Sequence, residues 1–359
     1  MKKYQVLGVM SGTSVDGVDL AFVRFSEKEE GQWTYEVQAA ATLDYDEEWE
    51  SKLQGAVQLS AVDLLVLNNS YGGWLGNQVK AFLEAQELEK PDFIASHGHT
   101  VYHQIDKGMT YQLGSGYHLS QAAGCRVVAD FRSLDVALGG EGAPLVPIAD
   151  EYLFGQFDFC LNLGGIANVS YKQGDLRRAF DIGLSNMLLN HLTQASGMKY
   201  DAGGALARSG SLSKGYFEQL NALPYFQLPS PKSTGFEWFA DEILPIAEQF
   251  NHLSLADALH TVVHHVAFQV AESINGIGQN GRIMVTGGGA KNDFMIDLIR
   301  EYAAAGLEVV VPDQQIVAFK EAIAFGLMGV LRMEGKVNCF ASVTGASSNT
   351  SGGIIFEVA

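Results

Sequence analysis

Two apolar runs flank a short polar loop near the start of the chain. Tyr4–Met10 is mostly apolar, and apolar residues occupy every second position of Val18–Phe22, which is the period of a half-buried strand. The pattern predicts a β-hairpin whose loop is Ser11–Gly17. Glycines there can turn backbone N–H groups toward an anion, and hydroxyl side chains add donors. Asp16 in the same loop can hold a hydrated divalent cation or, alternatively, cap an ordinary turn.

The same alternation continues through the first part of the chain. Further strands are predicted at Trp33–Thr42, Phe93–Ser96, Tyr111–Leu113 and Arg126–Ala129, with helices at Leu59–Leu88 and Tyr117–Ala123. The strand ending at Ser96 runs into the polar turn His97–Thr100. Open α/β sheets place ligand groups at the carboxyl ends of their strands, so this turn is a candidate binding segment.

Leu134–Pro147 is rich in glycine and proline and predicts a boundary or hinge. After it the pattern starts over, with strands at Phe157–Leu163, Ala167–Tyr171 and Arg177–Ile182 and a helix from Ser185 to about Ala195. Strand, glycine turn, strand, strand and helix is also the order at the start of the chain. We therefore expect two topologically similar halves, although the residues themselves do not repeat.

The remainder of the chain has the apolar spacing of helices. Helices are predicted at Ser211–Ala222, Gly235–Phe250, Leu255–Asn275 and Ala318–Arg332, and strands at Arg282–Thr286 and Glu308–Val311. Gly287–Gly289 follows the first of these strands and precedes a helix expected from Asn292. Glycines at such a position let a nucleotide approach the backbone. Three histidines, His260, His264 and His265, have helical metal-ligand spacing, but no glutamate stands in HExxH order beside them, so an ordinary helix face is the preferred interpretation.

Composition narrows the class of protein. The chain has 359 residues, 47% of them hydrophobic, and a net charge of -18, which is enough sequence for two domains with large cores. Its acidity argues against nucleic acid or an anionic membrane as a partner. Without a membrane-spanning run or a signal-peptide pattern, we expect a cytoplasmic protein. Three widely spaced cysteines favour reduced, buried thiols over a disulfide framework.

Several ordered motifs carry a resemblance to a known family. They are GVMSGTSVDGVDLA at 8–21, SHGHTVYH at 96–103, DFRSLDVALGGEGAPLVP at 130–147, LNLGGIANVS at 161–170, YDAGGALARSG at 200–210, PKSTG at 231–235 and VTGGGAKND at 285–293. Together they resemble the 1,6-anhydro-N-acetylmuramic acid kinases of the actin, sugar kinase and heat-shock ATPase superfamily. The resemblance covers essentially the whole chain, and this many ordered motifs are far more specific than one glycine loop.

The resemblance implies an α/β fold of two actin-like (ribonuclease H-like) domains, with mixed sheets flanking an ATP-binding cleft. The first domain would comprise residues 1–133 with about 335–359, and the second 134–334. The implied enzyme uses ATP and Mg²⁺ to open 1,6-anhydro-N-acetylmuramic acid with water and phosphorylate O6, giving N-acetylmuramic acid 6-phosphate in peptidoglycan recycling. A homodimer is compatible with this reading.

The resemblance also assigns residues by motif. It implies Asp181 as the catalytic base and Asp16 at the metal; ATP would contact Gly12, Thr13, Ser14, Gly17, Gly164, Gly165, Lys232, Gly287, Gly288 and Gly289, and the sugar His97, Asp130 and Glu321. Each role has a plainer alternative. Asp181 could cap the following helix, His97 could be a satisfied strand-end histidine, Lys232 a solvated loop lysine, and Glu321 a charge favoured at a helix N-terminus.

The chain departs from the family's pattern after the presumed base. Ile182, Leu184 and Ser185 stand where the family has threonine, proline and glycine; Asn190 replaces an aspartate and Phe236 an arginine. Two other functions therefore stay open: a nucleotide binder without sugar kinase activity, and a chaperone-like ATPase of the same superfamily. Against the chaperone, the sequence lacks a proline-linked peptide-binding domain.

Overall fold

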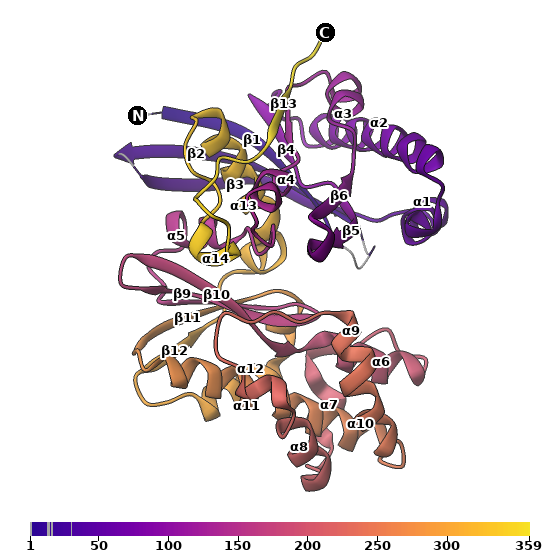
Figure 1. Cartoon of the computed structure of the whole chain (residues 1–359), viewed down its shortest axis with the longest axis vertical. Coiled ribbons are helices and arrows are strands. Elements are labelled where there is room, and N and C mark those ends of the chain that lie inside the picture. The colour runs from indigo at the N-terminus through magenta and orange to yellow at the C-terminus, as the bar shows by residue number, and fades with distance from the viewer. Residues whose placement is uncertain (1, 13–14, 16, 30) are drawn as a thin grey trace. The chain divides into compact units, whose positions relative to one another are not determined.

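The computed structural model describes every residue except Met1, Thr13, Ser14, Asp16 and Glu30. The chain forms two compact units (Figure 1). Unit 1 comprises residues 1–154 and 319–359, and unit 2 comprises residues 155–318. Unit 1 is thus completed by the C-terminal part of the chain, whereas unit 2 is one continuous segment.

Unit 1 is built on a six-stranded mixed sheet. Its order is β13 (Ile354–Phe356), β7 (Val127–Ala129), β4 (Phe93–Ser96), β1 (Lys2–Ser11), β2 (Val18–Glu29) and β3 (Gln32–Leu43). The first three strands of the chain form an antiparallel meander, and β4 and β7 extend the sheet in parallel from β1. The C-terminal strand β13 adds to the edge at β7 in antiparallel fashion.

Helices and a small second sheet surround this sheet. The helices are α1 (Glu47–Gln54), α2 (Ala61–Ala85), α3 (Gly116–Ala123), α4 (Ser133–Ala137), α5 (Pro147–Tyr152), α14 (Ala341–Thr344) and the part of α13 (Gln314–Met333) beyond residue 318; the small sheet pairs β5 (His99–Gln104) with β6 (Met109–Leu113). Ser60 explains the start of α2, because its side chain accepts a hydrogen bond from the Asp63 N–H.

Helix α13 packs unusually close to the central strands, and glycines make this possible. A Cβ at Gly8 would lie 1.9 Å from the Ala322 carbonyl oxygen, so only glycine fits where β1 meets the helix. On the helix side, a Cβ at Gly329 would lie 2.7 Å from the Phe93 ring. The backbone of the helix and the strand are therefore in direct contact.

Unit 2 repeats the strand order of unit 1. Its sheet runs β10 (Leu176–Leu184), β9 (Ile166–Gln173), β8 (Phe159–Leu163), β11 (Gly281–Thr286) and β12 (Leu307–Val310). Strands β8, β9 and β10 form an antiparallel meander, and β11 and β12 continue in parallel from β8. The predicted repetition of two halves is confirmed by this shared order. It is the arrangement of ribonuclease H-like domains, so the predicted fold class holds in each unit.

The helices of unit 2 pack on one face of its sheet. They are α6 (Asn186–Ala195), α7 (Ala205–Ser209), α8 (Lys214–Asn221), α9 (Phe236–Trp238), a π-helical turn (Phe239–Ile243), α10 (Leu244–Gln249), α11 (Leu255–Ile277) and α12 (Asp293–Tyr302). The helix predicted at Gly235–Phe250 is interrupted by the π-helical turn. Pro245, which follows it, lacks the N–H that a regular helix needs, and this accounts for the irregular turn.

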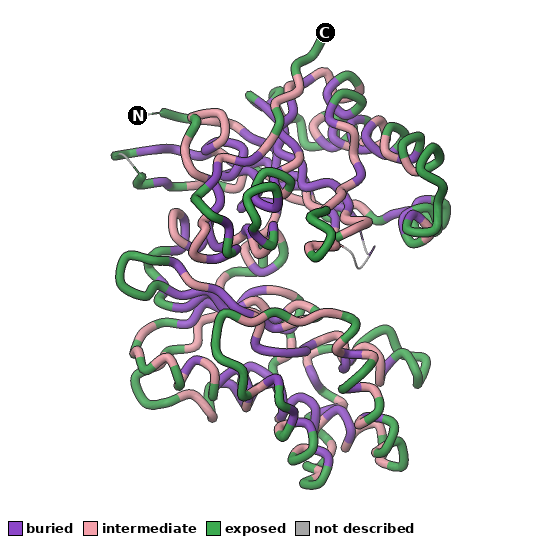
Figure 2. Tube along the Cα trace, in the orientation of Figure 1, coloured by how far each residue is buried: buried purple, intermediate pink, exposed green. Residues whose placement is uncertain are grey.

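The buried residues follow the strands of each sheet (Figure 2). In unit 2 the core joins alternate residues of the strands, such as Leu161, Val169 and Phe180, to Val263 and Val266 of α11. The three cysteines are free and buried, as the sequence predicts. None of the helices in the described part of the chain is long and apolar enough to cross a membrane.

The unit boundaries differ from the predicted ones. The chain crosses between units at 154/155 and 318/319 instead of 133/134 and 334/335. Residues 134–154 belong to unit 1 because Asp135, which is fully buried, accepts hydrogen bonds from the Gly142 N–H (2.8 Å) and the Thr344 hydroxyl (2.7 Å). The glycine-rich segment is thus fastened within one unit, which is a poor arrangement for the predicted hinge.

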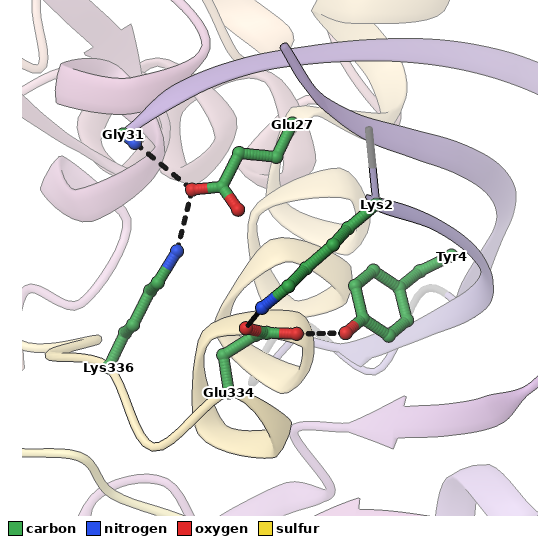
Figure 3. Close-up of polar contacts among 6 residues, drawn as sticks. All are labelled: Lys2, Tyr4, Glu27, Gly31, Glu334 and Lys336. Atoms are coloured by element: carbon green, nitrogen blue, oxygen red, sulfur yellow. Dashed lines mark hydrogen bonds and ion pairs between the residues drawn. The ribbon is translucent and has the colours of Figure 1, made fainter. Parts of the chain in front are cut away.

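Polar contacts fasten the end of α13 to the first strands (Figure 3). Lys336 lies 2.6 Å from Glu27 Oε1, which also accepts the Gly31 N–H at 3.0 Å. Glu334 bonds both Lys2 and the Tyr4 hydroxyl. Hydrogen bonds from Lys336 and Lys2 lower the pKa of Glu27 and Glu334, respectively, so both carboxylates stay charged in the folded protein at neutral pH.

Buried histidines predict a loss of stability in mild acid. His265 is 3% exposed, and burial lowers its pKa to about 3. Below pH 6.5 the unfolded chain therefore binds a proton that the folded chain does not, and stability falls as pH falls. We expect one such histidine to cost about 2 kcal/mol between pH 7 and pH 5. Denaturant titrations should show His265→Asn reducing the pH dependence by that amount, and an unchanged slope would contradict the assignment.

Candidate functional site

Asp181 lies on β10, the edge strand of the unit 2 sheet, beside a register irregularity between Asp181 and Gly183. Its cross-strand partner is Asn168, which in turn pairs with Asn162 on β8. Residues paired across adjacent strands lie on the same face of a sheet. The presumed base therefore stands at the end of a row of polar side chains. Sequence reasoning did not single out the two asparagines.

The loop that contains PKSTG docks on Asp181. The Asp181 N–H donates to the Lys232 carbonyl oxygen (2.9 Å), and the Thr234 N–H donates to Asp181 Oδ2 (3.1 Å). The Lys232 ammonium donates to the Tyr225 carbonyl oxygen (3.1 Å) and lies 4.5 Å from the centre of the Tyr225 ring. Burial lowers the pKa of Lys232. Asp181 and Lys232, which the sequence predicts for one site, therefore lie close together.

The glycine turns after β8 and β11 also lie side by side. Asn186, the first residue of α6, donates from Nδ2 to the carbonyl oxygens of Leu163 and Gly164, both at 2.9 Å. The same nitrogen would lie 3.6 Å from a Cβ at Gly288 and 3.4 Å from one at Gly289. Asn186 therefore bridges the two turns, and the predicted ATP-contacting glycines of unit 2 form one cluster at the carboxyl ends of β8 and β11.

The packing of the protein requires glycine at some of these positions and not at others. Gly287 has φ +82°, and a Cβ there would lie 2.5 Å from Asn162 Oδ1; a Cβ at Gly289 would lie 2.6 Å from Leu163 Cβ. The fold itself excludes side chains at both. At Gly164, Gly165 and Gly288 the nearest atoms would be at least 3.4 Å away, and φ is not left-handed. A side chain at these three positions would make only ordinary contacts, so they are the candidates for close approach of a ligand.

The YDAGG segment borders this cluster. Both carboxylate oxygens of Asp201 accept N–H groups of α7, from Leu206 at 2.9 Å and Ala207 at 2.8 Å. Gly204 lies against the Asn292 side chain at the start of α12. A shallow hollow opens here, lined by Ala202, Gly203, Ala205, Arg208, Ser209 and Asp293. Because Asp293 is the first residue of α12, the hollow lies next to the helix that follows the Gly287–Gly289 turn.

In unit 1 the hairpin loop begins at Ser11, whose side chain belongs to a buried network of hydrogen-bonded polar side chains. Ser11 is 1% exposed, and its hydroxyl lies 2.8 Å from the Tyr45 hydroxyl and 3.2 Å from His99 Nδ1. Tyr45 in turn contacts the Tyr71 hydroxyl at 2.6 Å. Burial lowers the pKa of His99 to about 4, so the ring is neutral at pH 7. The Ser11 hydroxyl is thus committed to the protein interior and is not the anion donor that the sequence suggested.

Only part of the loop itself is described. Thr13, Ser14 and Asp16, predicted for phosphate and metal contacts, lie outside the described residues. Gly12 is half-buried. Gly17 has φ +146°, and a Cβ there would lie 2.9 Å from the Leu43 carbonyl oxygen, so the packing of the hairpin already requires glycine at this position.

His97, which follows β4, is buried and contacts the partly exposed Arg132. Arg132 donates from Nε to His97 Nε2 at 2.9 Å and from a terminal nitrogen to the Gly142 carbonyl oxygen at 2.6 Å. Burial lowers the pKa of Arg132 to about 10, and the charge of Glu321 opposes this effect. Burial raises the pKa of Glu321, against the attraction of Arg132 and Lys320. The structure thus connects His97 with Glu321 through Arg132, which sequence reasoning missed.

The local environment of Glu321 differs from the expected one, and that of Asp130 is a turn. Glu321 does not open a helix, because α13 begins at Gln314, so the helix-dipole alternative for this residue does not apply. Asp130 follows β7 with φ +61°, a conformation that aspartate tolerates better than most residues. Its Oδ1 accepts the Ser133 N–H at 3.3 Å, so it supports the turn into α4.

The histidines of α11 are accounted for by hydrogen bonds. His260 Nδ1 contacts the Ala207 carbonyl oxygen at 2.9 Å, His264 Nδ1 the Tyr302 hydroxyl at 2.7 Å, and His265 Nδ1 the Asn221 Oδ1 at 2.8 Å. Within the described part of the chain, no cluster of three or more histidine, cysteine or acidic side chains could hold a metal ion. The helix-face reading of this motif is the one that the contacts support.

The residues after Asp181 that depart from the family's pattern are buried within unit 2. Ile182 is 1% exposed and Leu184 5% exposed, and both belong to the hydrophobic core of unit 2. The Ser185 N–H donates to the Gly165 carbonyl oxygen at 2.9 Å, and its side chain is fully buried. The Ser185 N–H is therefore already used within unit 2.

Both units have the strand order of the ribonuclease H-like domains of the actin-like superfamily, and unit 2 has paired glycine turns at its strand ends. A sequence profile of the family "Anhydro-N-acetylmuramic acid kinase" matches residues 4–358. The chain therefore belongs to the anhydro-N-acetylmuramic acid kinase family.

Individual relatives agree with this assignment. The anhydro-N-acetylmuramic acid kinase of Shewanella pealeana is 34% identical, with 97% of each chain aligned, and that of Aliivibrio fischeri is 34% identical with 99% of each aligned. Among solved structures, component A of the (R)-2-hydroxyglutaryl-CoA dehydratase of Acidaminococcus fermentans aligns at 12% identity and a TM-score of 0.46, covering 90% of this chain and 96% of that one. The fold assignment here depends on strand order and not on that similarity.

Proposed function

We propose that this protein is an ATP-dependent kinase that opens 1,6-anhydro-N-acetylmuramic acid with water and phosphorylates O6, giving N-acetylmuramic acid 6-phosphate and ADP. Family membership over residues 4–358 is the observation that carries the proposal. The placement of Asp181 supports it, because ring opening requires a base to take a proton from the attacking water. The enzyme is a transferase acting on an amino sugar, with a role in peptidoglycan recycling in the cytoplasm.

Each group of residues has a task in this reaction. Asp181 removes a proton from water as the water attacks the anomeric carbon, and the C1–O6 bond breaks. The freed O6 then attacks the γ-phosphate of ATP, which requires the two to lie in line. His97, Arg132, Asp130 and Glu321 bind the sugar, and their mixture of charges suits its carboxylate, hydroxyl and amide groups. Arg132, which is partly exposed, is the cation available to the lactyl carboxylate.

The glycine cluster of unit 2 suits the nucleotide. Gly164, Gly165 and Gly288 leave room for ATP at the strand ends, and the hollow beside α12 is the proposed location of the adenosine part. The remaining proposed ATP contacts are Gly12, Thr13, Ser14, Gly17 and Lys232. Mg²⁺ usually binds through substrate phosphates and one or two carboxylates, so a dedicated cluster is not needed. Asp16 is the proposed protein ligand, and the ion would neutralise charge on the phosphates.

The proposal is tested by measuring ADP release with and without the anhydro sugar. We expect turnover that depends on the sugar and on Mg²⁺, with one N-acetylmuramic acid 6-phosphate formed per ADP. Sugar-independent ATP hydrolysis would favour a chaperone-like ATPase, and ATP binding without turnover would favour a non-catalytic nucleotide binder. We also propose that the protein is a homodimer, which sedimentation of the same preparation tests.

The glycine cluster gives a prediction with an internal control. Gly165→Ala should raise the KM for ATP by at least ~10-fold and leave the melting temperature nearly unchanged, because its Cβ would make only ordinary van der Waals contact with the Met187 side chain. Gly289→Ala should instead lower stability by ~2 kcal/mol, because its Cβ collides with Leu163. Steady-state kinetics and thermal unfolding on both variants separate the two effects. An unchanged KM in Gly165→Ala would remove this glycine from the nucleotide site.

A further inference from the structure

Asp181 is held on its outer side by one short segment of chain. Because β10 is an edge strand, the outward-facing main-chain groups of Asp181 have no neighbouring strand to bond. Instead, its N–H donates to the Lys232 carbonyl oxygen at 2.9 Å, and its carbonyl oxygen accepts the Tyr225 hydroxyl at 2.7 Å. The Thr234 N–H reaches the carboxylate at 3.1 Å. Main chain and side chain are thus both fixed by residues 225–234.

Tyr225 is the centre of this arrangement. Its side chain is 8% exposed, and burial, with a smaller effect of the Asp181 charge, raises its pKa well above the usual value, so the hydroxyl remains a donor at any ordinary pH. Its carbonyl oxygen accepts the Lys232 ammonium, and its ring lies beneath the same ammonium. Trp238 packs on the ring with a centroid separation of 4.6 Å. A rigid aromatic side chain therefore links the loop at Lys232 to the backbone of Asp181.

We propose that Tyr225 and Lys232 are positioning residues for the reaction, which act by holding the carboxylate of Asp181 at a fixed place and angle. The inference rests on the proposed function and assigns Lys232 a different part in it, since the ammonium bonds a carbonyl oxygen and covers a ring rather than contacting phosphate. A general base acts efficiently only within hydrogen-bond reach of its proton, and small displacements of such a group are costly. The clamp formed by Tyr225, Lys232 and Thr234 supplies this precision.

The first variant removes one oxygen atom. Tyr225→Phe keeps the buried ring and deletes the bond to the Asp181 carbonyl oxygen. We expect kcat to fall by about 10-fold, with KM for ATP and for the sugar within about 2-fold of the parent. Tyr216→Phe is the matched control, because Tyr216 is also buried in unit 2 and its hydroxyl has no partner among the described residues. The control should keep the parent's kcat, and equal kcat values in both variants would overturn the proposal.

The second variant separates positioning from phosphate binding. Lys232→Met keeps a long side chain over the Tyr225 ring and removes the ammonium. Positioning predicts a lower kcat at an unchanged KM for ATP, whereas a phosphate ligand predicts a KM for ATP raised by at least ~10-fold. The latter result would overturn the assignment of Lys232.

A third measurement does not depend on turnover. The Asp181 amide, protected by the Lys232 carbonyl oxygen, should exchange its hydrogen at least ~10-fold faster in Tyr225→Phe than in Tyr216→Phe. Sugar-dependent ADP release by the parent protein tests the proposed function on its own. A parent without that activity contradicts the proposed function, while equal amide exchange in the two variants contradicts the clamp.

Discussion

We expect Asp181→Asn to lower the turnover of the anhydro sugar by at least ~100-fold while ATP binding stays nearly intact. An amide cannot take the proton from the attacking water, and loss of a general base is typically worth a factor of 10²–10⁴. The asparagine still offers an oxygen to the Thr234 N–H, so the loop should remain docked. Calorimetric titration with ATP and product formation on one preparation measure the two quantities.

Asp175→Asn is the control for this experiment. Asp175 lies in the exposed turn between β9 and β10, so the same chemical change is made on the same hairpin away from the site. Its turnover should equal that of the parent protein. Near-parent turnover in Asp181→Asn would mean that another group is the base.

Gly8→Ala should destabilise unit 1 by at least ~3 kcal/mol. The added methyl would lie 1.9 Å from the Ala322 carbonyl oxygen, so β1 and α13 must move apart in the middle of the core. For a unit of this size the melting transition should fall by roughly 6–12 °C. Scanning calorimetry measures it, with the transition of unit 2 as an internal reference.

Gly73→Ala provides the opposite expectation from the same chemical change. Gly73 lies inside α2, and a Cβ there meets no atom within 4 Å. Alanine favours the helix by roughly 0.5–1 kcal/mol over glycine, so this variant should be as stable as the parent or slightly more stable. If the Gly8→Ala protein melts at the same temperature as the Gly73→Ala protein, β1 and α13 can move apart without loss of stability.

Local sequence patterns predicted most of the strands because apolar alternation is a local property. The pattern failed where polarity dominates. His99–Gln104 forms β5, although the sequence predicts a polar turn up to Thr100, because this strand pairs with β6 in a small sheet and buries little apolar side chain. Helix α1 was missed because only Trp49 and Leu53 are buried. Asp46, which caps that helix by accepting the Trp49 N–H, was the signal that could have revealed it.

The candidate site was predictable only as far as its motifs are local. Asp181, Lys232 and the glycine turns were found from the sequence, but Tyr225 and Arg132 act through contacts that no local pattern encodes. The interpretation of Ile182 could have been improved from the sequence alone. In a strand successive side chains point to opposite faces, so an Asp181 that faces the site directs Ile182 into the core. A hydroxyl at that position would therefore face the core.

The interrupted sequence of unit 1 sets an order of folding during synthesis. Unit 2 is a single stretch that is translated before residues 319–359, so it can complete its sheet and core without that last part of unit 1. Unit 1 must wait with β1 uncovered, because the helix that contacts Gly8 and the strand that closes the edge at β7 are translated after unit 2. The nascent chain therefore carries an unfinished N-terminal half, and this half is the part for which we expect chaperone binding.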